Sequence, residues 1–179
     1  MTGVLLLILP LFISASLHMA IVKWDLLAFA KKPLSQPLFG RNKTWRGFLV
    51  MPPLTLLGVE IAHRLTLLWF ADWAWLWPEN PVDRWFLGLM LGLAYVLFEL
   101  PNSWFKRRRG IAEGARAERN AWIFIVIDQG DSALGCALCY ALLWPETAPY
   151  VPMLVLIGPA VHLFGNYLLF KLKLRKEPV

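Results

Sequence analysis

The stretch GVLLLILPLFISASLHMAIV, residues 3–22, decides the class of this protein, because it contains no Lys, Arg, Asp or Glu. A helix needs about 20 mostly apolar residues to cross about 30 Å of hydrocarbon. Four further segments approach that length, at residues 47–62, 85–100, 121–143 and 151–170. The sequence therefore predicts an all-α integral membrane protein with five transmembrane helices at about these positions.

The predicted helix at residues 47–62 has the least regular sequence of the five. Pro52, Pro53, Gly58 and Glu60 interrupt its apolar residues. Proline removes a backbone donor and disturbs a helix interior. We therefore expect this segment to be kinked or partly re-entrant.

The composition of the whole chain agrees with a membrane location. Of its 179 residues, 58% are hydrophobic and only 17% are charged, and the mean hydropathy is +0.54. A soluble core of this size cannot use so much apolar surface, so a soluble enzyme and a disordered chain are both excluded. The two cysteines, Cys136 and Cys139, lie within one apolar run and are expected to be packing residues without a disulfide framework.

The basic residues predict the orientation. Sixteen of the 18 Lys and Arg fall in three clusters, at residues 23–46, 106–119 and 171–176, whereas Arg64 and Arg84 flank the remaining loop. Because cytoplasmic loops carry an excess of Lys and Arg, we expect the N-terminus outside and the C-terminus in the cytoplasm.

This layout predicts a single polytopic domain over residues 1–179, in the plasma membrane, with cytoplasmic loops at residues 23–46 and 101–120. The formal net charge is +6. The positive charges form short clusters between apolar runs and do not follow one polar face, so an anionic lipid or a phosphate fits better than nucleic acid.

Two carboxylates lie within the predicted fourth membrane helix. Asp128 and Asp131 are three residues apart, which places them on one helix face with about 5–6 Å between their Cβ atoms. An unpaired carboxylate inside a membrane costs several kcal/mol, so a cationic group must meet them. Because carboxylate oxygens suit Mg²⁺, we expect a metal site, with a structural contact between helices as the alternative.

The first basic loop ends with PLFGRNKTWRG, residues 37–47. Lys43 and Arg46 supply positive charge, Asn42 and Thr44 supply neutral hydrogen-bonding groups, and the glycines allow close backbone approach. This composition suits a polyphosphate, although the segment is not a Walker loop. The alternative is an ordinary cytoplasmic anchor.

The segment ELPNSWFKRRRG, residues 99–110, follows the predicted third helix. Glu99 and Ser103 precede four successive cations that begin with Lys106 and Arg107. Arg binds phosphate through two donors and Lys acts as a compact charge, so this segment predicts a site for a lipid headgroup or a nucleotide phosphate. Attraction to the lipid surface, about 1 kcal/mol per cation, is the alternative, and it explains Glu99 and Ser103 less well.

Two weaker candidates are pairs of polar residues on one helix face. His162 and Asn166 are four residues apart in the predicted fifth helix, so either a structural contact or a substrate contact is expected. Glu60 and His63 are three residues apart, and we expect a structural or interfacial role for them.

Taken together, three segments resemble the CDP-archaeol synthase family of small membrane cytidylyltransferases. They are LFGRNKTWRG at 38–47, SWFKRRRGI at 103–111 and DQGDSALG at 128–135. The ending from His162, with Asn166 inside it, is also similar, so the likeness runs from about residue 37 to the tail. The family pattern has Asp where this chain has Glu99, and it differs again at Pro101 and Asn102.

The resemblance implies an enzyme that joins CTP to a lipid phosphate, releases pyrophosphate and uses Mg²⁺ in phospholipid synthesis. We expect these residues at the catalytic centre: Asp128, Asp131, Lys106 and Lys43. We expect these residues to bind substrate: Asn42, Thr44, Arg46, Ser103, Arg107 and Asn166. We expect these metal ligands: Asp128, Asp131 and Glu99.

The expected partners are CTP, a lipid phosphate and membrane lipids, with a homodimer as a possible assembly and the active site facing the cytoplasm. The sequence leaves open whether the lipid tails are isoprenoid ethers or acyl chains. Two other functions stay open as well. One is a small transporter or proton or cation relay that uses the paired aspartates, and the other is an assembly protein whose basic loops recruit anionic lipid.

Overall fold

The computed structural model describes residues 1–112 and 121–174, with side chains from residue 126 in the second range. Within these residues the chain is helical, and the isolated bridge between Pro33 and Thr44 is its one strand-like pairing. The elements in order are α1 (Thr2–Lys23), η1 (Ala28–Ala30), α2 (Gln36–Phe39), α3 (Trp45–Trp69), η2 (Ala71–Leu76), α4 (Pro81–Arg108), α5 (Ala121–Leu143), η3 (Pro145–Tyr150) and α6 (Val151–Lys171).

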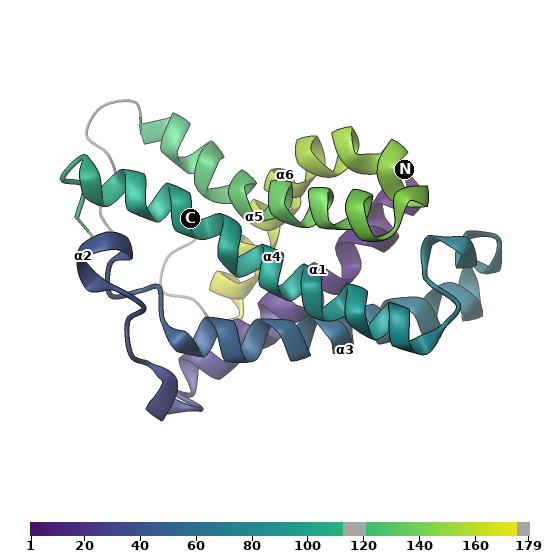
Figure 1. Ribbon diagram of the computed structural model, residues 1–179, viewed down its shortest axis with the longest axis horizontal. Coiled ribbons are helices and arrows are strands. Elements are labelled where there is room, and N and C mark those ends of the chain that lie inside the picture. The colour runs from purple at the N-terminus through teal and green to yellow at the C-terminus, as the bar shows by residue number, and fades with distance from the viewer. Residues whose placement is uncertain (113–120, 175–179) are drawn as a thin grey trace.

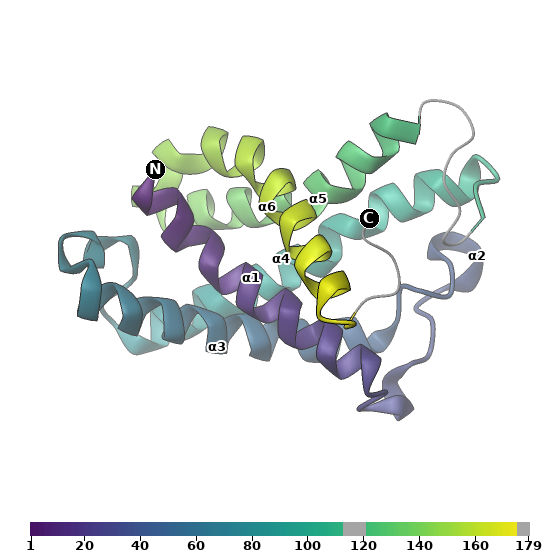
Figure 2. The same cartoon turned by 180° about the vertical axis from the view of Figure 1, so that it is seen from behind.

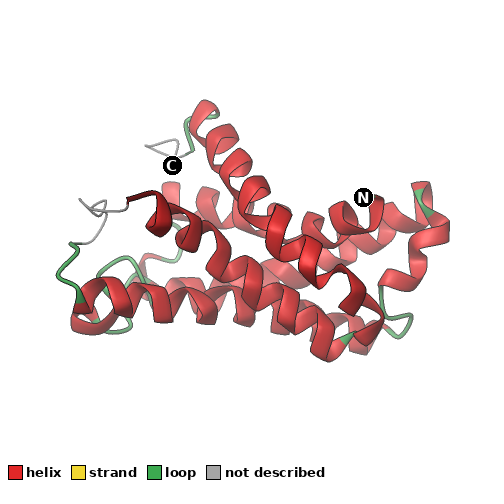
Figure 3. Cartoon of the chain, turned by 90° about the horizontal axis from the view of Figure 1, so that it is seen from above, coloured by secondary structure: helices red, strands yellow, loops and turns green. Residues whose placement is uncertain are grey.

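The five long helices pack as a ring (Figures 1 and 2). Helix α1 packs on α3, α3 on α4, α4 on α5 and α5 on α6, and α6 returns to α1. Helices α1, α4 and α6 end at the side of the bundle where α3 and α5 begin, whereas the N-terminus lies towards the other side (Figures 1 and 3). The first predicted basic loop and the basic end of α4 therefore lie at one side of the molecule, whereas residues 113–120 of the second predicted loop lie outside the described residues.

Four stretches of the described residues are long and apolar enough to cross a membrane: Thr2–Lys23, Trp45–Trp69, Pro81–Arg108 and Pro145–Lys171. Helix α5 has 23 residues and occupies the position of the other predicted span, but its first five side chains lie outside the described residues. The helical class is thus confirmed, together with four of the five expected spans by length and composition.

Two helices are longer than the apolar runs predict. Helix α3 is continuous over its 25 residues, with Pro52 and Pro53 inside it, so the expectation of a partly re-entrant segment at 47–62 is wrong. Helix α4 has 28 residues and ends at Arg108, not at residue 100. The first part of the predicted loop at 101–120 is therefore helical, because polar turns can continue a helix after its apolar run has ended.

Helix α3 packs closely against α4 at Pro52 and Leu56. A Cβ atom at Gly92 would lie 2.5 Å from the Cα atom of Pro52, and one at Gly88 would lie 2.6 Å from the Cα atom of Leu56. Only glycine fits at such distances, as is typical of helix pairs whose backbones approach closely in membranes. This pair of helices carries Arg46, Glu99, Lys106 and Arg107, four of the charged side chains described below.

The opposite side of the bundle is held by a buried arginine. Arg84 donates to a carboxylate oxygen of Glu60 at 2.7 Å and to the carbonyl of Pro78 at 2.8 Å. The structural role expected for Glu60 is confirmed by this ion pair. Rings of Trp73, Trp75 and Tyr150 pack together at the same side.

Candidate functional site

A cavity of about 800 Å³ lies inside the ring of helices. One end of it is charged and is lined by Lys31, Arg41, Lys43, Arg46, Glu99, Lys106, Arg107 and Asp128. The other end is apolar, and its lining includes Ile8, Leu11, Phe12, Cys136, Ala137 and Leu154. The cavity can therefore hold a molecule, or a pair of molecules, with both an anionic and a hydrocarbon part.

Backbone hydrogen bonds fold the first basic loop into a wall of this cavity. The amide of Leu34 donates to the carbonyl of Lys43 at 2.8 Å, and the amide of Trp45 donates to the carbonyl of Lys32 at 3.0 Å. Gly40 has a φ of +85°, a conformation that glycine adopts without strain. These contacts fix the backbone at Lys43, and Asn42 and Thr44 on either side of it also line the cavity.

Arg46 lies in the first turn of α3 and is only 5% exposed. Its Nη1 donates to Asp25 at 2.9 Å and to the carbonyl of Leu26 at 3.3 Å, whereas its buried Nε has no partner in the described chain. Hydrogen bonds from Lys31, and then from Arg46, hold the pKa of Asp25 below its usual value. Arg46 thus retains one donor that a bound anion can use.

Lys43 forms an ion pair with Glu99, which joins the basic loop to α4. Burial by itself lowers the pKa of Lys43, but the Glu99 carboxylate and, more weakly, Asp131 and Asp128 outweigh it, so the pKa is raised. Lys43 therefore stays protonated. Glu99, which the sequence predicts as a metal ligand, serves this lysine in the structure.

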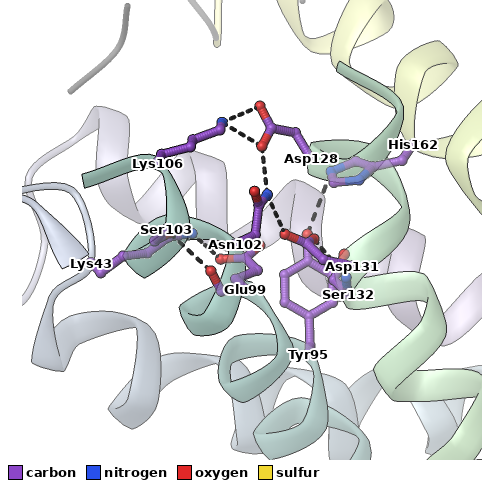
Figure 4. A network of polar contacts seen from close by, with 10 residues as sticks. All are labelled: Lys43, Tyr95, Glu99, Asn102, Ser103, Lys106, Asp128, Asp131, Ser132 and His162. Atoms are coloured by element: carbon purple, nitrogen blue, oxygen red, sulfur yellow. Dashed lines mark hydrogen bonds and ion pairs between the residues drawn. The ribbon is translucent and has the colours of Figure 1, made fainter. Parts of the chain in front are cut away.

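The two aspartates of α5 meet the last turns of α4 (Figure 4). The Nδ2 of Asn102 donates to Asp128 Oδ1 at 2.6 Å and to Asp131 Oδ2 at 3.0 Å. Lys106 forms an ion pair with Asp128, and Asp131 Oδ1 accepts from the amide of Ser132 at 2.6 Å. The cationic partner expected for the acids is confirmed for Asp128, and both carboxylates converge on one atom of Asn102.

The donor groups at this point fit Mg²⁺. Asp128 and Asp131 each present an oxygen to the position of one Asn102 nitrogen, and magnesium is commonly held by one or two carboxylates together with substrate phosphates. Across residues 1–112 and 121–174, no three acidic, His or Cys side chains lie close enough to share a metal ion. The fit shown by these contacts is to the two aspartates, and Glu99, which pairs with Lys43 here, stays a predicted ligand.

The remaining predicted residues differ in how they reach the cavity. Arg107 lines it, and its buried Nε has no partner in the part of the chain described. The Oγ of Ser103 donates to the carbonyl of Glu99 at 2.9 Å within its own helix, and Ser103 is not among the lining residues. Asn166 lines the cavity and donates to Gln129 Oε1 at 3.1 Å.

The site contains residues that are absent from the sequence prediction, among them Asn102, Asp25 and Gln129. Asn102 is three residues after Glu99 and four before Lys106, a spacing that puts all three on one helix face. That signal appears only if the helix is continued past residue 100. Asp25 and Gln129 have no comparable signal, because their partners are distant in the sequence.

Comparison with known proteins gives one consistent family. The CarS-like family model, described as CDP-archaeol synthase, matches residues 2–179. The CDP-archaeol synthase of Archaeoglobus fulgidus is 29% identical over 147 residues, covering 79% of this chain and 76% of its own length. The CDP-archaeol synthase of Staphylothermus marinus is 31% identical over 149 residues, covering 79% of this chain and 72% of its own length. No solved structure shows significant similarity to the chain.

Proposed function

The chain belongs to the CarS-like CDP-archaeol synthase family, and from this premise we propose that it transfers CMP from CTP to a membrane lipid phosphate. The products would be a CDP-lipid for phospholipid synthesis and pyrophosphate. The observation that carries the proposal is the two-ended cavity of about 800 Å³. Its charged end suits phosphate groups and its apolar end suits lipid chains.

The charged end supplies the groups that this reaction needs. Lys43, Arg46, Lys106 and Arg107 would hold the triphosphate and the lipid phosphate, and the unpartnered Nε atoms of the two arginines support this assignment. Asn42 and Thr44 would add neutral hydrogen bonds beside Lys43. Positioning and neutralisation of charge dominate phosphoryl-transfer chemistry.

Asp128 and Asp131 would hold Mg²⁺. When bound, the metal ion would neutralise phosphate charge in the transition state. Lys106, which is paired with Asp128 in the structure, would then be released to bind phosphate.

The proposed reaction is one displacement at phosphorus. An oxygen of the lipid phosphate forms a bond to the α-phosphorus of CTP, and the bond from that phosphorus to the oxygen bridging to the β-phosphate breaks. The attacking oxygen is already anionic, so no side chain has to remove a proton. The protein contributes alignment of two anions that would otherwise repel each other.

The proposal includes five membrane crossings, made by the four candidate spans together with α5, in the plasma membrane and with the N-terminus outside. The charged end of the cavity would then face the cytoplasm, where CTP is found. The lipid is a glycerol phosphate with either isoprenoid ether or acyl chains, and the isoprenoid form is the first to test because the relatives are CDP-archaeol synthases.

The cation transporter is less well supported. Lys106 is paired with Asp128, and Lys43, Arg46 and Arg107 line the same cavity. This positive charge would oppose the passage of a cation. The same charges favour the binding of two phosphate-bearing substrates.

The test is formation of a CDP-lipid by the purified protein in lipid nanodiscs, with Mg²⁺, labelled CTP and either an isoprenoid diether glycerol phosphate or phosphatidic acid. We expect Asp128→Asn and Asp131→Asn to lower turnover about 100-fold or more without loss of the folded protein. Asp83→Asn, at an exposed acid on the opposite side, is the control. Absence of CDP-lipid with both lipids, or full activity of both variants, would contradict the proposal.

A further inference from the structure

Neutral polar side chains lie between the charged and apolar ends of the cavity. We call them the polar band, which consists of Tyr95, Gln129, Ser132, His162 and Asn166, all of them lining residues. They come from α4, α5 and α6, so the band faces the cavity from three helices. None of them carries a full charge at neutral pH in its ordinary state, except that His titrates near that range.

The band keeps hydrogen-bonding capacity for a ligand. Asn166 and Gln129 are 4% and 6% exposed, and the 3.1 Å bond between them uses one donor and one acceptor of two amides. The Tyr95 hydroxyl lies 3.5 Å from Nε2 of His162, which is longer than usual for a hydrogen bond, and it also has a side-chain hydrogen bond with Ser132. Figure 4 shows the Tyr95 ring directed towards His162, beside Asp131 and Ser132.

Along helix α5 the side chains that line the cavity change in polarity. Asp128, Ser132 and Cys136 follow one another at intervals of four residues and all line it. At 1.5 Å per residue, each interval is about 6 Å along the helix. The wall therefore changes from charged to neutral polar to apolar over about 12 Å.

The lining residues of helix α6 change from polar to apolar in the same direction. On α6 the lining residues Asn166, His162, Gly158 and Leu154 run from the polar to the apolar part. A glycerolipid phosphate has the same sequence of groups, since its glycerol joins the phosphate to the chains. With the phosphate at the cations and the chains at the apolar end, the glycerol must lie at the level of the polar band.

We propose that the polar band binds the linkage oxygens of the glycerol backbone, so that the protein selects glycerol phosphates over lipids in which one chain is attached directly to the phosphate. Linkage oxygens, whether of ethers or of esters, only accept hydrogen bonds. The Tyr95 hydroxyl and the Gln129 amide can donate them. The inference rests on the proposed function and adds to it the residues, Tyr95 and Gln129, that recognise the glycerol part of the lipid.

The experiment compares a dialkyl glycerol phosphate with a single-chain alkyl phosphate, using wild type, Tyr95→Phe and Gln129→Leu. We expect Tyr95→Phe to lose about tenfold in kcat/KM for the glycerol phosphate, the effect of one hydrogen bond. Gln129→Leu should lose at least as much, because it also removes the acceptor of Asn166. The kcat/KM for the alkyl phosphate and the KM for CTP should not change. Tyr150→Phe, the same change in the aromatic cluster on the opposite side, is the matched control.

Lipid binding without CTP, measured by displacement of a fluorescent lipid phosphate, gives a second readout for the same proteins. Three results would overturn the role of the polar band. They are an equal loss of kcat/KM on both lipids, a raised KM for CTP, and no preference of the wild type for the glycerol phosphate. If the wild type binds the glycerol phosphate preferentially but forms no CDP-lipid, the proposed function is wrong, whereas the role of the polar band in lipid binding is supported. Thermal melts of Tyr95→Phe show whether that variant is folded.

Discussion

Replacing Glu99 by Gln would leave Lys43 partly buried without its main counter-charge. The two side chains are 22% and 27% exposed and form the ion pair that joins the basic loop to α4. Exposed ion pairs contribute about 0–1 kcal/mol, whereas removal of one partner of a buried pair costs about 3–5 kcal/mol. For this intermediate burial we expect a loss of about 1–3 kcal/mol.

In a chain of this size, each kcal/mol changes Tm by about 2–4 °C, so Tm should fall by between about 2 and 12 °C. Tryptophan fluorescence during heating of the purified protein in detergent measures this change. Glu79→Gln, at an exposed acid on the opposite side, should melt like the wild type.

The pKa of Lys43 also predicts how the stabilisation by this ion pair depends on pH. Because the pKa of Lys43 is raised above its ordinary value of 10.5, the pair stabilises the fold fully below that value and loses its effect as the pH rises through the raised pKa. The Tm difference between wild type and Glu99→Gln should therefore be constant from about pH 7 to about pH 9 and shrink only above about pH 10.5. Equal melting temperatures at neutral pH, or a difference that vanishes by about pH 9, would refute this reasoning.

Two further changes test the packing of the helices. Gly92→Ala would place a methyl group 2.5 Å from the backbone of Pro52 and should cost about 1–3 kcal/mol in a thermal melt; Gly47→Ala, with its nearest contact at 3.8 Å, should not. Arg84→Gln leaves the partly buried Glu60 without its counter-charge and should cost about 1–3 kcal/mol, while the KM for CTP stays the same; a changed KM would show that this ion pair influences the cavity.

The sequence predicts the helices well where an apolar run covers the whole helix. The run at 121–143 coincides with α5, and the runs at 3–22 and 151–170 differ from α1 and α6 by a residue or so at their ends. The errors lie in α3 and α4, where the helix continues into polar or aromatic turns. Pro52 and Pro53 favour an interrupted segment, but helix α3 continues through both. The close fit of Pro52 on Gly92 depends on another helix, which the local sequence does not show.

The site could be predicted as a set of residues but not as a set of contacts. Asp128 and Asp131 share a helix face, and their meeting with Lys106 follows from the need for a counter-charge. The sequence does not show that Glu99 pairs with Lys43, since two helices and a loop must first be placed. The bridge made by Asn102 does not follow from the sequence prediction, because that prediction places residues 101–120 in a loop.

The folded basic loop has a thermodynamic consequence for any anion that binds beside it. Ordering a residue costs about 1–2 kcal/mol of backbone entropy, and here the bridge between Pro33 and Thr44 and the contact of Arg46 with Asp25 order the loop as part of the fold. An incoming phosphate therefore meets a preorganised receptor, and its affinity is not reduced by the cost of immobilising a flexible segment.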